Sequence, residues 1–205
     1  QSTIQENVTS ISGVPTWTLV LFKRILELTG KQSIAEVWPS LELYLHGGVA
    51  FGPYKQQFAQ LLGKDVTFMN MYNASEGFFG IQDRSDSEDL LLMLDYGIFY
   101  EFIPLDNPDD QQAEAIGLDA VELGKNYAMV ITTNAGLWRY NIGDTVRFTS
   151  KSPYRIKISG RTKHFMNAFG EEIIVENADA AITRACEVTG AVIENFTAAP
   201  IYLEQ

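Results

Sequence analysis

Three short segments of this chain carry side chains that suit the binding of a nucleotide and its metal ion. The side chains are Tyr72, Ser75 and Glu76 in the first segment, Asp144 in the second and Arg161 in the third. A carboxylate can orient Mg²⁺, and the planar fork of an arginine suits a phosphate or a carboxylate. If folding brings the three segments together, they predict a site for a nucleotide and its metal ion.

Each side chain has a candidate role and a simpler alternative. Glu76 is the candidate magnesium ligand and catalytic carboxylate, with Ser75 beside it as a hydrogen-bonding partner for a phosphate or ribose oxygen. The two oxygens of Asp144 could accept hydrogen bonds from both ribose hydroxyls. Arg161 is the candidate catalytic cation. The alternatives are ordinary turns at Ser75, Glu76 and Asp144 and a surface ion pair at Arg161.

A glycine pair, Gly47 and Gly48, precedes these segments in the chain. Glycine would let the backbone pass flat against an adenine ring, although a plain turn would also use it. The pair follows a predicted strand at 41–45, and a predicted helix at 53–63 leads to the next strand at 66–71. Strand, helix and strand in this order predict parallel pairing, which brings the glycines and the start of the Tyr72 segment to one carboxyl edge of a sheet.

The rest of the chain has a different pattern. Short strands are expected at 90–94, 98–103, 127–133, 145–149 and 154–158, which is typical of an antiparallel sheet or half-barrel. Apolar spacing predicts one helix at 17–28, and another that begins with Asn177 as its cap and ends at Gly190, followed by a strand at 191–197. The acidic stretches at 83–89 and 106–114 are interpreted as solvated loops.

The expected fold class is therefore α/β. A parallel strand-helix-strand unit is followed by an antiparallel sheet or half-barrel, and then by the start of a small α+β C-terminal lobe. The expected large domain covers residues 1–160, divided into regions 14–83 and 84–160, and residues 161–205 are expected to begin the small domain.

Composition excludes several classes of protein. The chain has 205 residues, 46% of them apolar, and a formal charge of −11, with no stripe of Lys and Arg that would attract nucleic acid. No run reaches the roughly 18 apolar residues of a membrane span. The single cysteine, Cys186, is expected to pack within a helix, and it fits a reducing cytoplasm. The start of the chain has neither an initiating Met nor a signal peptide, which suggests an excerpt of a longer protein.

Stretches at 43–80, 136–147 and 159–177 resemble the adenylate-forming superfamily, and most closely the bacterial form of the Gretchen Hagen auxin-responsive family of acyl-acid amido synthetases. The family motif of tyrosine, two serines and glutamate matches the Tyr72 segment, with Ala74 at the position of the first serine. The motif of tyrosine, basic residue, any residue, glycine and aspartate matches Tyr140 to Asp144, with Asn141 in place of the basic residue.

The resemblance implies residue roles. Gly47, Gly48 and Val49 would line the adenine pocket, and Tyr72 and Ser75 would contact the nucleotide. Glu76 would serve the phosphates and magnesium, and Asp144 would hold the ribose. A hinge is implied near Lys163 and His164. Both His164 and His46 are expected to be structural rather than catalytic.

The resemblance also implies a reaction. ATP and magnesium would convert a carboxylic acid into an acyl adenylate, and an amine, expected to be an amino acid, would then form an amide. Partners are thus small molecules, without nucleic acid or membrane. Two alternatives stay open: an acyl-CoA ligase of the same superfamily, and a non-catalytic nucleotide-binding module. The latter gains weight from Ala74, Asn141 and the lack of a recognisable glycine-rich phosphate loop with its lysine.

Overall fold

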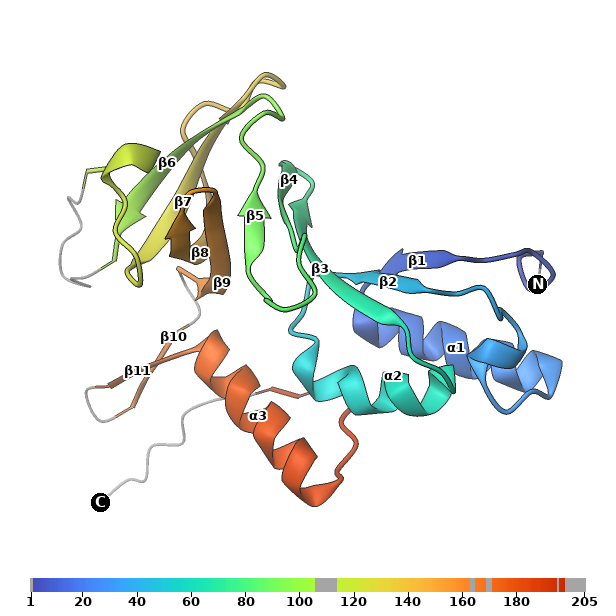
Figure 1. Ribbon diagram of the computed structural model, residues 1–205. Helices are drawn as coiled ribbons and strands as arrows, with labels where there is room; N and C mark the ends of the chain where they lie inside the picture. The colour runs from blue at the N-terminus through green and yellow to red at the C-terminus, as the bar shows by residue number, and fades with distance from the viewer. Residues whose placement is uncertain (1, 106–113, 163–164, 169–170, 195, 198–205) are drawn as a thin grey trace, which may run out of the picture. The chain divides into compact units, whose positions relative to one another are not determined.

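The computed structural model describes residues 2–105, 114–162, 165–168, 171–194 and 196–197 (Figure 1). The chain forms two compact units. The first comprises Gln1–Met71 and Asp179–Thr197, and the second is built on Tyr72–Ala178. The unit boundaries fall inside a strand and inside a helix. The domain boundary expected after residue 160 stays a prediction.

The first unit is built on a parallel sheet, as predicted. Its strands are β1 (Ser10–Gly13), β2 (Leu43–His46) and the start of β3 (Thr67–Ala74). β2 pairs in parallel with both β1 and β3, with Tyr44 opposite Ile11 on one side and Phe68 on the other. β1 was not predicted, because its four residues contain only one large apolar side chain.

The helices of this unit begin and end at the local signals in the sequence. α1 (Pro15–Thr29) has proline in its first turn, where a fixed φ and a missing N–H cost nothing, and it ends at Gly30 with φ +67°. A short 3-10 turn, η1 (Ile34–Glu36), follows α1. The predicted helix at 53–63 consists of a 3-10 turn, η2 (Gly52–Tyr54), and α2 (Lys55–Leu62), which ends at the left-handed Gly63.

An aromatic core joins these helices to the sheet. Tyr44 stacks on Phe58 with ring centroids 4.8 Å apart, and Phe22 meets Phe58 edge to face at 5.7 Å. All three side chains are almost fully buried, and burying each of them contributes about 2 to 3 kcal/mol. The remaining fully or largely buried members of this core are Leu19, Ile25, Ile34, Trp38, Leu41, Tyr54 and Leu62.

The second unit contains the predicted antiparallel sheet. Its strand order is β4-β5-β9-β8-β7-β6, and each neighbouring pair is antiparallel. The strands are β4 (Gly77–Ile81), β5 (Leu90–Leu92), β6 (Ile98–Pro104), β7 (Asn126–Thr133), β8 (Tyr140–Lys151) and β9 (Tyr154–Arg161). A short 3-10 turn, η3 (Leu118–Ala120), lies between β6 and β7.

The core of this unit lies against the antiparallel strands. Phe102 meets Phe148 edge to face at 4.9 Å, and both are buried. The other buried members include Phe79, Leu90, Tyr100, Tyr127, Met129, Ile131, Val146 and Ile156. Alternate residues of each strand supply these side chains, which is the period of a half-buried sheet.

The C-terminal part of the described chain differs from prediction at two places. After the hairpin of β10 (Phe165–Ala168) and β11 (Glu171–Ile174), α3 (Val175–Thr189) begins before Asn177, so Asn177 lies in its first turn and is not the cap. The strand predicted at 191–197 is wrong for the residues that the structure describes there. The carbonyl of Ile193 instead accepts a hydrogen bond from the side-chain amide of Gln57 at 2.7 Å, which replaces sheet pairing.

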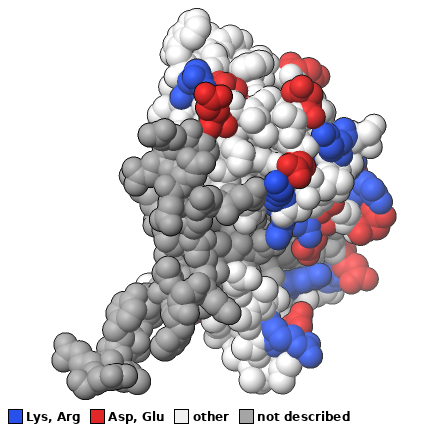
Figure 2. Space-filling view, turned by 90° about the vertical axis from the view of Figure 1, so that its left-hand side faces the viewer, with Lys and Arg blue, Asp and Glu red and all other residues white. Residues whose placement is uncertain are grey.

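Within the described ranges, none of the helices combines the length and apolar character needed to cross a membrane. Acidic and basic side chains lie next to one another on the face shown in Figure 2. Ion pairs also form along single helices, such as Arg24 with Glu27 on α1 at 2.9 Å. The described residues on the face in Figure 2 form no broad basic area.

Candidate functional site

The segment that begins at Tyr72 forms the end of one strand and the turn into the next. β3 continues to Ala74, and Ser75 and Glu76 are the two-residue turn between β3 and β4. Ser75 is exposed and Glu76 is half-buried, so both can reach a ligand at this turn. At Gly77 a Cβ would come within 2.9 Å of Cδ1 of Ile98, so the end of that side chain would have to move to admit a larger residue.

Asp144 lies inside β8 and not at its start, because the strand begins at Tyr140. Gly143 before it has φ +83°, a conformation that favours glycine. The Gly143 N–H donates to Oδ1 of Asn141 at 2.9 Å, and its carbonyl accepts the N–H of Thr162 at 2.8 Å. Asn141 therefore supports the bend that presents Asp144, a role that the resemblance did not assign to it.

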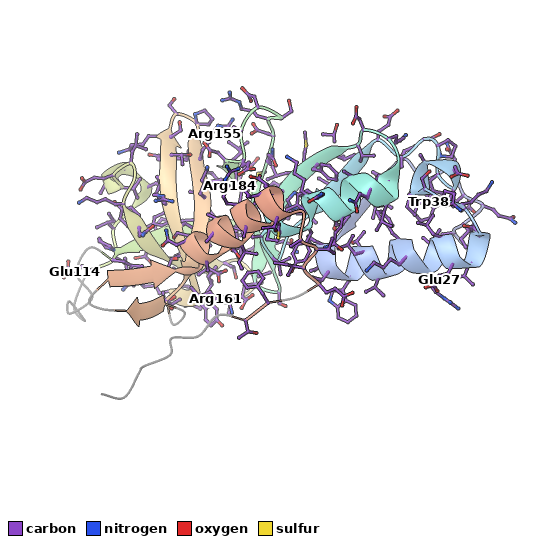
Figure 3. The ribbon with its side chains drawn as sticks, turned by 90° about the horizontal axis from the view of Figure 1, so that it is seen from below. Glu27, Trp38, Glu114, Arg155, Arg161 and Arg184 are labelled. Carbon is purple, nitrogen blue, oxygen red and sulfur yellow. The ribbon has the colours of Figure 1, made fainter. Side chains whose placement is uncertain are left out.

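Asp144 joins two other predicted residues. Arg161, labelled in Figure 3, lies opposite it on β9 and donates from Nε to Oδ1 at 2.8 Å. The hydroxyl of Tyr72 donates to Oδ2 of Asp144 at 2.7 Å. Tyr72 is 5% and Asp144 9% exposed, whereas the Arg161 side chain is 59% exposed. Tyr72, 72 residues before Asp144, thus meets Asp144 and its hairpin partner Arg161 at one carboxylate.

The charges of this cluster reinforce one another. Burial raises the pKa of Tyr72 far above its usual value, and the negative charge of Asp144 raises it further. Tyr72 is therefore a neutral hydroxyl donor at all physiological pH values. The hydrogen bond to Asp144 raises the pKa of Arg161, with smaller contributions from Tyr72 and Glu76. The charge of Glu76 hence acts on Arg161 only through space, whereas Asp144 contacts its guanidinium directly.

Gly47, Gly48 and Val49 follow β2 in the first unit, whereas the other predicted site residues belong to the second. Gly47 is buried, and a Cβ there would meet the Met71 carbonyl oxygen well inside the 3.0 Å that real Cβ atoms keep. Gly48 has φ +82° and is exposed, as is Val49. Glycine is thus required at both positions by the backbone itself.

His46 has a more unusual environment than the sequence indicated. Its ring stacks on Phe51 with centroids 4.2 Å apart, across the glycine turn, and it is 6% exposed. Burial lowers its pKa to about 4, so the imidazole is neutral at physiological pH. Its Nδ1 is buried without a hydrogen-bonding partner among the residues that the structure describes. The stack closes the turn that carries Gly47 and Gly48.

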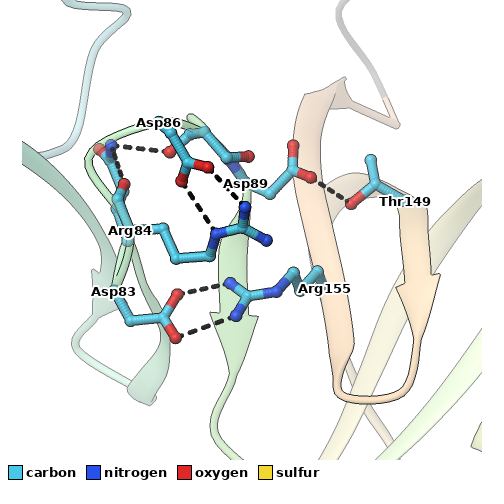
Figure 4. Close-up of polar contacts among 8 residues, drawn as sticks. Asp83, Arg84, Asp86, Asp89, Thr149 and Arg155 are labelled. Atoms are coloured by element: carbon cyan, nitrogen blue, oxygen red, sulfur yellow. Dashed lines mark hydrogen bonds and ion pairs between the residues drawn. The ribbon is translucent and has the colours of Figure 1, made fainter.

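The acidic stretch at 83–89 is a mostly exposed loop, as interpreted, and ion pairs and hydrogen bonds also tie it to the sheet. Asp83 forms a two-pronged ion pair with Arg155 on β9, with Nη2 and Oδ2 3.0 Å apart (Figure 4). Asp89 accepts a hydrogen bond from the Thr149 hydroxyl at 2.9 Å. Arg84 and Asp86 pair within the loop. A basic residue on a distant strand therefore decides the structure of this loop, and no local signal predicts that partner.

The described residues offer few side chains that could bind a metal ion together. No group of three or more His, Cys, Asp and Glu side chains lies close enough to hold a metal ion there. Mg²⁺ does not need such a group, because it usually keeps several waters and binds one or two carboxylates together with substrate phosphates. The residues present thus fit a nucleotide-borne magnesium ion at Glu76. The implied hinge, Lys163 and His164, lies outside the described residues.

Comparison with known proteins gives consistent results. Residues 1–67 match the GH3 family N-terminal domain, and residues 91–161 match the GH3 family central domain. The chain is 34% identical over 130 residues to the indole-3-acetic acid-amido synthetase GH3.2 of Arabidopsis thaliana, covering 57% of this chain and 23% of that protein. It is 32% identical over 139 residues to the jasmonoyl-L-amino acid synthetase GH3.5 of Oryza sativa subsp. japonica, covering 58% and 24%. The chain thus spans about a quarter of these relatives.

Solved structures share the fold. The AtGH3.15 acyl acid amido synthetase in complex with 2,4-DB superposes with a TM-score of 0.72 at 16% identity, over 92% of this chain and 42% of that one. An open conformation of 2-hydroxyisobutyryl-CoA ligase gives 0.62 at 17% identity, over 90% and 43%. These likenesses confirm the expected α/β fold. Two adjoining domains of one family match well over half of the residues, and the chain therefore belongs to the GH3 family, the Gretchen Hagen family that its motifs resemble.

Proposed function

We propose that this chain is part of an ATP-dependent acyl-acid amido synthetase. The intact protein adenylates a carboxylic acid with release of pyrophosphate, and an amino acid then attacks the acyl adenylate to give an amide and AMP. The observation that carries the proposal is the meeting of Tyr72, Asp144 and Arg161, from three separate motifs, at one buried carboxylate. Family membership and the names of the relatives support the same reaction class.

Each residue has a role in this reaction. Asp144 accepts hydrogen bonds from the ribose hydroxyls through the lone pairs that its protein partners leave. Gly47, Gly48 and Val49 give the adenine a surface without large side chains, since two of the three positions require glycine. Ser75, exposed in the turn after β3, hydrogen-bonds a phosphate oxygen. Fixing the ribose and phosphates aligns the α-phosphate with the attacking carboxylate, and such alignment lowers the barrier by several kcal/mol.

Two charged residues act where the charge changes. The exposed end of Arg161 is available to the carboxylate or phosphate oxygens, while its Nε is held by Asp144. Glu76 would hold magnesium from the turn, and the ion would supply positive charge to the phosphates. The departing pyrophosphate is thereby stabilised from two sides. We also propose that the intact protein works in the cytoplasm, which suits the buried, unpaired state of Cys186, the one cysteine of this chain.

We further propose that residues 1–160 belong to the large domain of the enzyme and that residues 161–205 begin its small C-terminal domain. Arg161 is the last residue of β9, so the boundary would fall at the end of a strand. A pivot soon after Arg161 would let the small domain rotate between the two half-reactions. Such a pivot would keep Asp144 in place while it moves the residues that follow Arg161.

The reaction is tested by acid-dependent exchange of labelled pyrophosphate into ATP, catalysed by the intact protein that contains this chain. The expected result is exchange that requires a carboxylic acid and magnesium and falls at least about 100-fold in Glu76→Ala and in Asp144→Ala. Absence of exchange with every acid of a broad panel would refute the proposal. The mass of the product formed with an amino-acid mixture or with coenzyme A then separates an amide from a thioester.

A further inference from the structure

The later turns of α3 and the residues that follow it belong to the first unit, where they are attached at separate points. The side-chain amide of Gln57 on α2 donates to the carbonyl oxygen of Ile193 at 2.7 Å, and Gln57 is 5% exposed. Lys23 on α1 lies 3.7 Å from the carboxylate of Glu194, and both side chains of this ion pair are exposed. Because exposed ion pairs contribute little, the buried amide of Gln57 is the stronger of these two attachments.

The backbone of η2 comes close to α3 at Gly52. A Cβ on Gly52 would lie 2.5 Å from Oγ1 and 2.9 Å from Cγ2 of Thr183. The Thr183 hydroxyl donates to the Asp179 carbonyl at 2.7 Å, one turn earlier in α3, and this bond holds the side chain in place. Any side chain at position 52 would therefore push α3 away from η2.

A further interaction joins the same two elements. Burial raises the pKa of Asp179 on α3. Burial also raises the pKa of Tyr54, the last residue of η2, and the charge of Asp179 raises it further. Asp179 and Thr183 are four residues apart, so they lie on one face of the helix. This face of α3 is the one that meets η2.

The contact between α3 and the first unit is shallow. The members of the aromatic core in this unit lie between Val8 and Phe68 in the chain, and none of the described residues of 179–197 belongs to it. Among those same residues, only Cys186 is buried. Contacts between domains that bury little apolar surface open readily. α3 can therefore leave η2 without disturbing the core beneath it.

We propose that η2 and α2 form a docking surface for α3, centred on Gly52 and Gln57, and that docking holds the small domain in one of its two rotational states. This inference rests on the proposed function, because it needs the pivot after Arg161. It adds the contact at which the rotation stops. α3 then releases η2 and docks again once in every catalytic cycle, and the docked state serves one half-reaction.

A disulfide between positions 52 and 183 would lock the docked state in the intact protein. A Cβ on Gly52 would lie 3.3 Å from Cβ of Thr183, close to the roughly 3.5 to 4.5 Å that a disulfide spans. The test combines Gly52→Cys and Thr183→Cys in a Cys186→Ala background, and peptide mass spectrometry identifies the bond after oxidation. Pyrophosphate exchange measures the first half-reaction, and amide formation from supplied acyl adenylate and amino acids measures the second.

We expect the oxidised protein to keep one half-reaction, while the other and complete turnover fall at least about 10-fold until the disulfide is reduced. The matched control is Gly52→Cys with Arg184→Cys in the same background. Arg184 is next to Thr183, but its side chain is 74% exposed and pairs with Glu187. This control should form no bond to position 52, and oxidation should change neither half-reaction.

Gln57→Leu tests the same contact without a cross-link. The variant keeps the size of the side chain and loses the hydrogen bond to Ile193. Weaker docking should favour the half-reaction that the disulfide suppresses and change the ratio of the two rates about 5-fold, the usual effect of one hydrogen bond.

Three results with the cysteine pair would overturn the inference. These are the absence of the disulfide in the folded protein, normal turnover by the oxidised protein, and an equal loss of both half-reactions. An unchanged ratio of the two rates in Gln57→Leu would overturn it as well. Absence of pyrophosphate exchange in the unmodified protein would instead refute the proposed function, and with it this inference.

Discussion

The ion pair between Asp83 and Arg155 allows a quantitative prediction of what holds the loop after β4. Arg155 lies on β9, between Leu91 of β5 and Ser150 of β8, and its side chain is 10% exposed. Asp83 reaches it from the loop with a side chain that is 35% exposed. We predict that Arg155→Ala lowers the free energy of unfolding because it leaves Asp83 without its partner.

The magnitude follows from the exposure of the two ends. Breaking a fully buried pair costs about 3 to 5 kcal/mol, and breaking an exposed pair costs about 0 to 1 kcal/mol. Because the Arg155 side chain is buried and the Asp83 side chain is partly exposed, Arg155→Ala should lower the free energy of unfolding by about 2 to 3 kcal/mol. Asp83→Asn, which keeps the shape and one acceptor, should cost about 1 to 2 kcal/mol. The double variant should cost less than the two single losses added together.

Urea unfolding followed by circular dichroism measures these differences. Arg24→Ala is the control, since Arg24 and Glu27 are each 64% exposed and their pair should contribute less than about 0.5 kcal/mol. Hydrogen bonding to Arg155 lowers the pKa of Asp83, so the pair stabilises the protein above the ordinary value of 3.8 and less as the pH falls below it. The difference between wild type and Arg155→Ala should shrink at pH 3. A loss at pH 7 no larger than that of Arg24→Ala would refute the reasoning.

Three further predictions concern the first unit. Gly47→Ala should lower the free energy of unfolding by about 1 to 3 kcal/mol in thermal unfolding, because its Cβ would overlap the Met71 carbonyl. In the control Gly30→Ala, the Cβ would have no atom within 4 Å, so the loss should be only that of left-handed strain, about 1 kcal/mol. Equal losses in the two variants would contradict the prediction. Burial lowers the pKa of His46 from 6.5 to about 4, so the unfolded chain takes up a proton at higher pH than the folded chain, and stability should decrease between pH 6.5 and 4. The difference between the urea midpoints at pH 7 and pH 5 should be smaller in His46→Phe than in the unmodified protein. An equal difference in both proteins would exclude His46 as its source. Phe58→Ala should cost about 3 to 5 kcal/mol in urea unfolding, because Phe58 is completely buried; a cost below 1 kcal/mol would mean that this core collapses around the cavity.

Local signals in the sequence predicted most of the regular elements. Proline at the start and glycine just after the end bounded α1 to within two residues, because both residue types act on their own backbone. The spacing of short apolar runs between turns located five of the six strands of the antiparallel sheet, β5 to β9, and missed β4. Elements without a local signal were missed or misplaced. β1 has too few apolar side chains to show a pattern, and the apolar run after Gly190 was mistaken for a strand.

The residue types of the candidate site were also evident from the sequence. A hydroxyl, carboxylates, a guanidinium and a glycine pair were identified from their spacing in the motifs, and the family was identified from the same residues. The burial and hydrogen-bonding partners of these residues were not evident from the sequence. Asp144 was expected at a strand start with both oxygens free for a ligand, yet it lies within β8 with a protein donor on each oxygen.

The sequence by itself therefore determined the local elements, the chemical groups and their order, because propensity, periodicity and turn chemistry depend on near neighbours. Only the tertiary structure decided which groups meet. Tyr72 and Asp144 are 72 residues apart, and Asp83 and Arg155 are also 72 residues apart. Both contacts depend on strand register and burial, and the contact of Asp144 also depends on the bend at Gly143. These properties arise from the packing of the whole unit, because burial excludes the water that would otherwise satisfy each polar group alone.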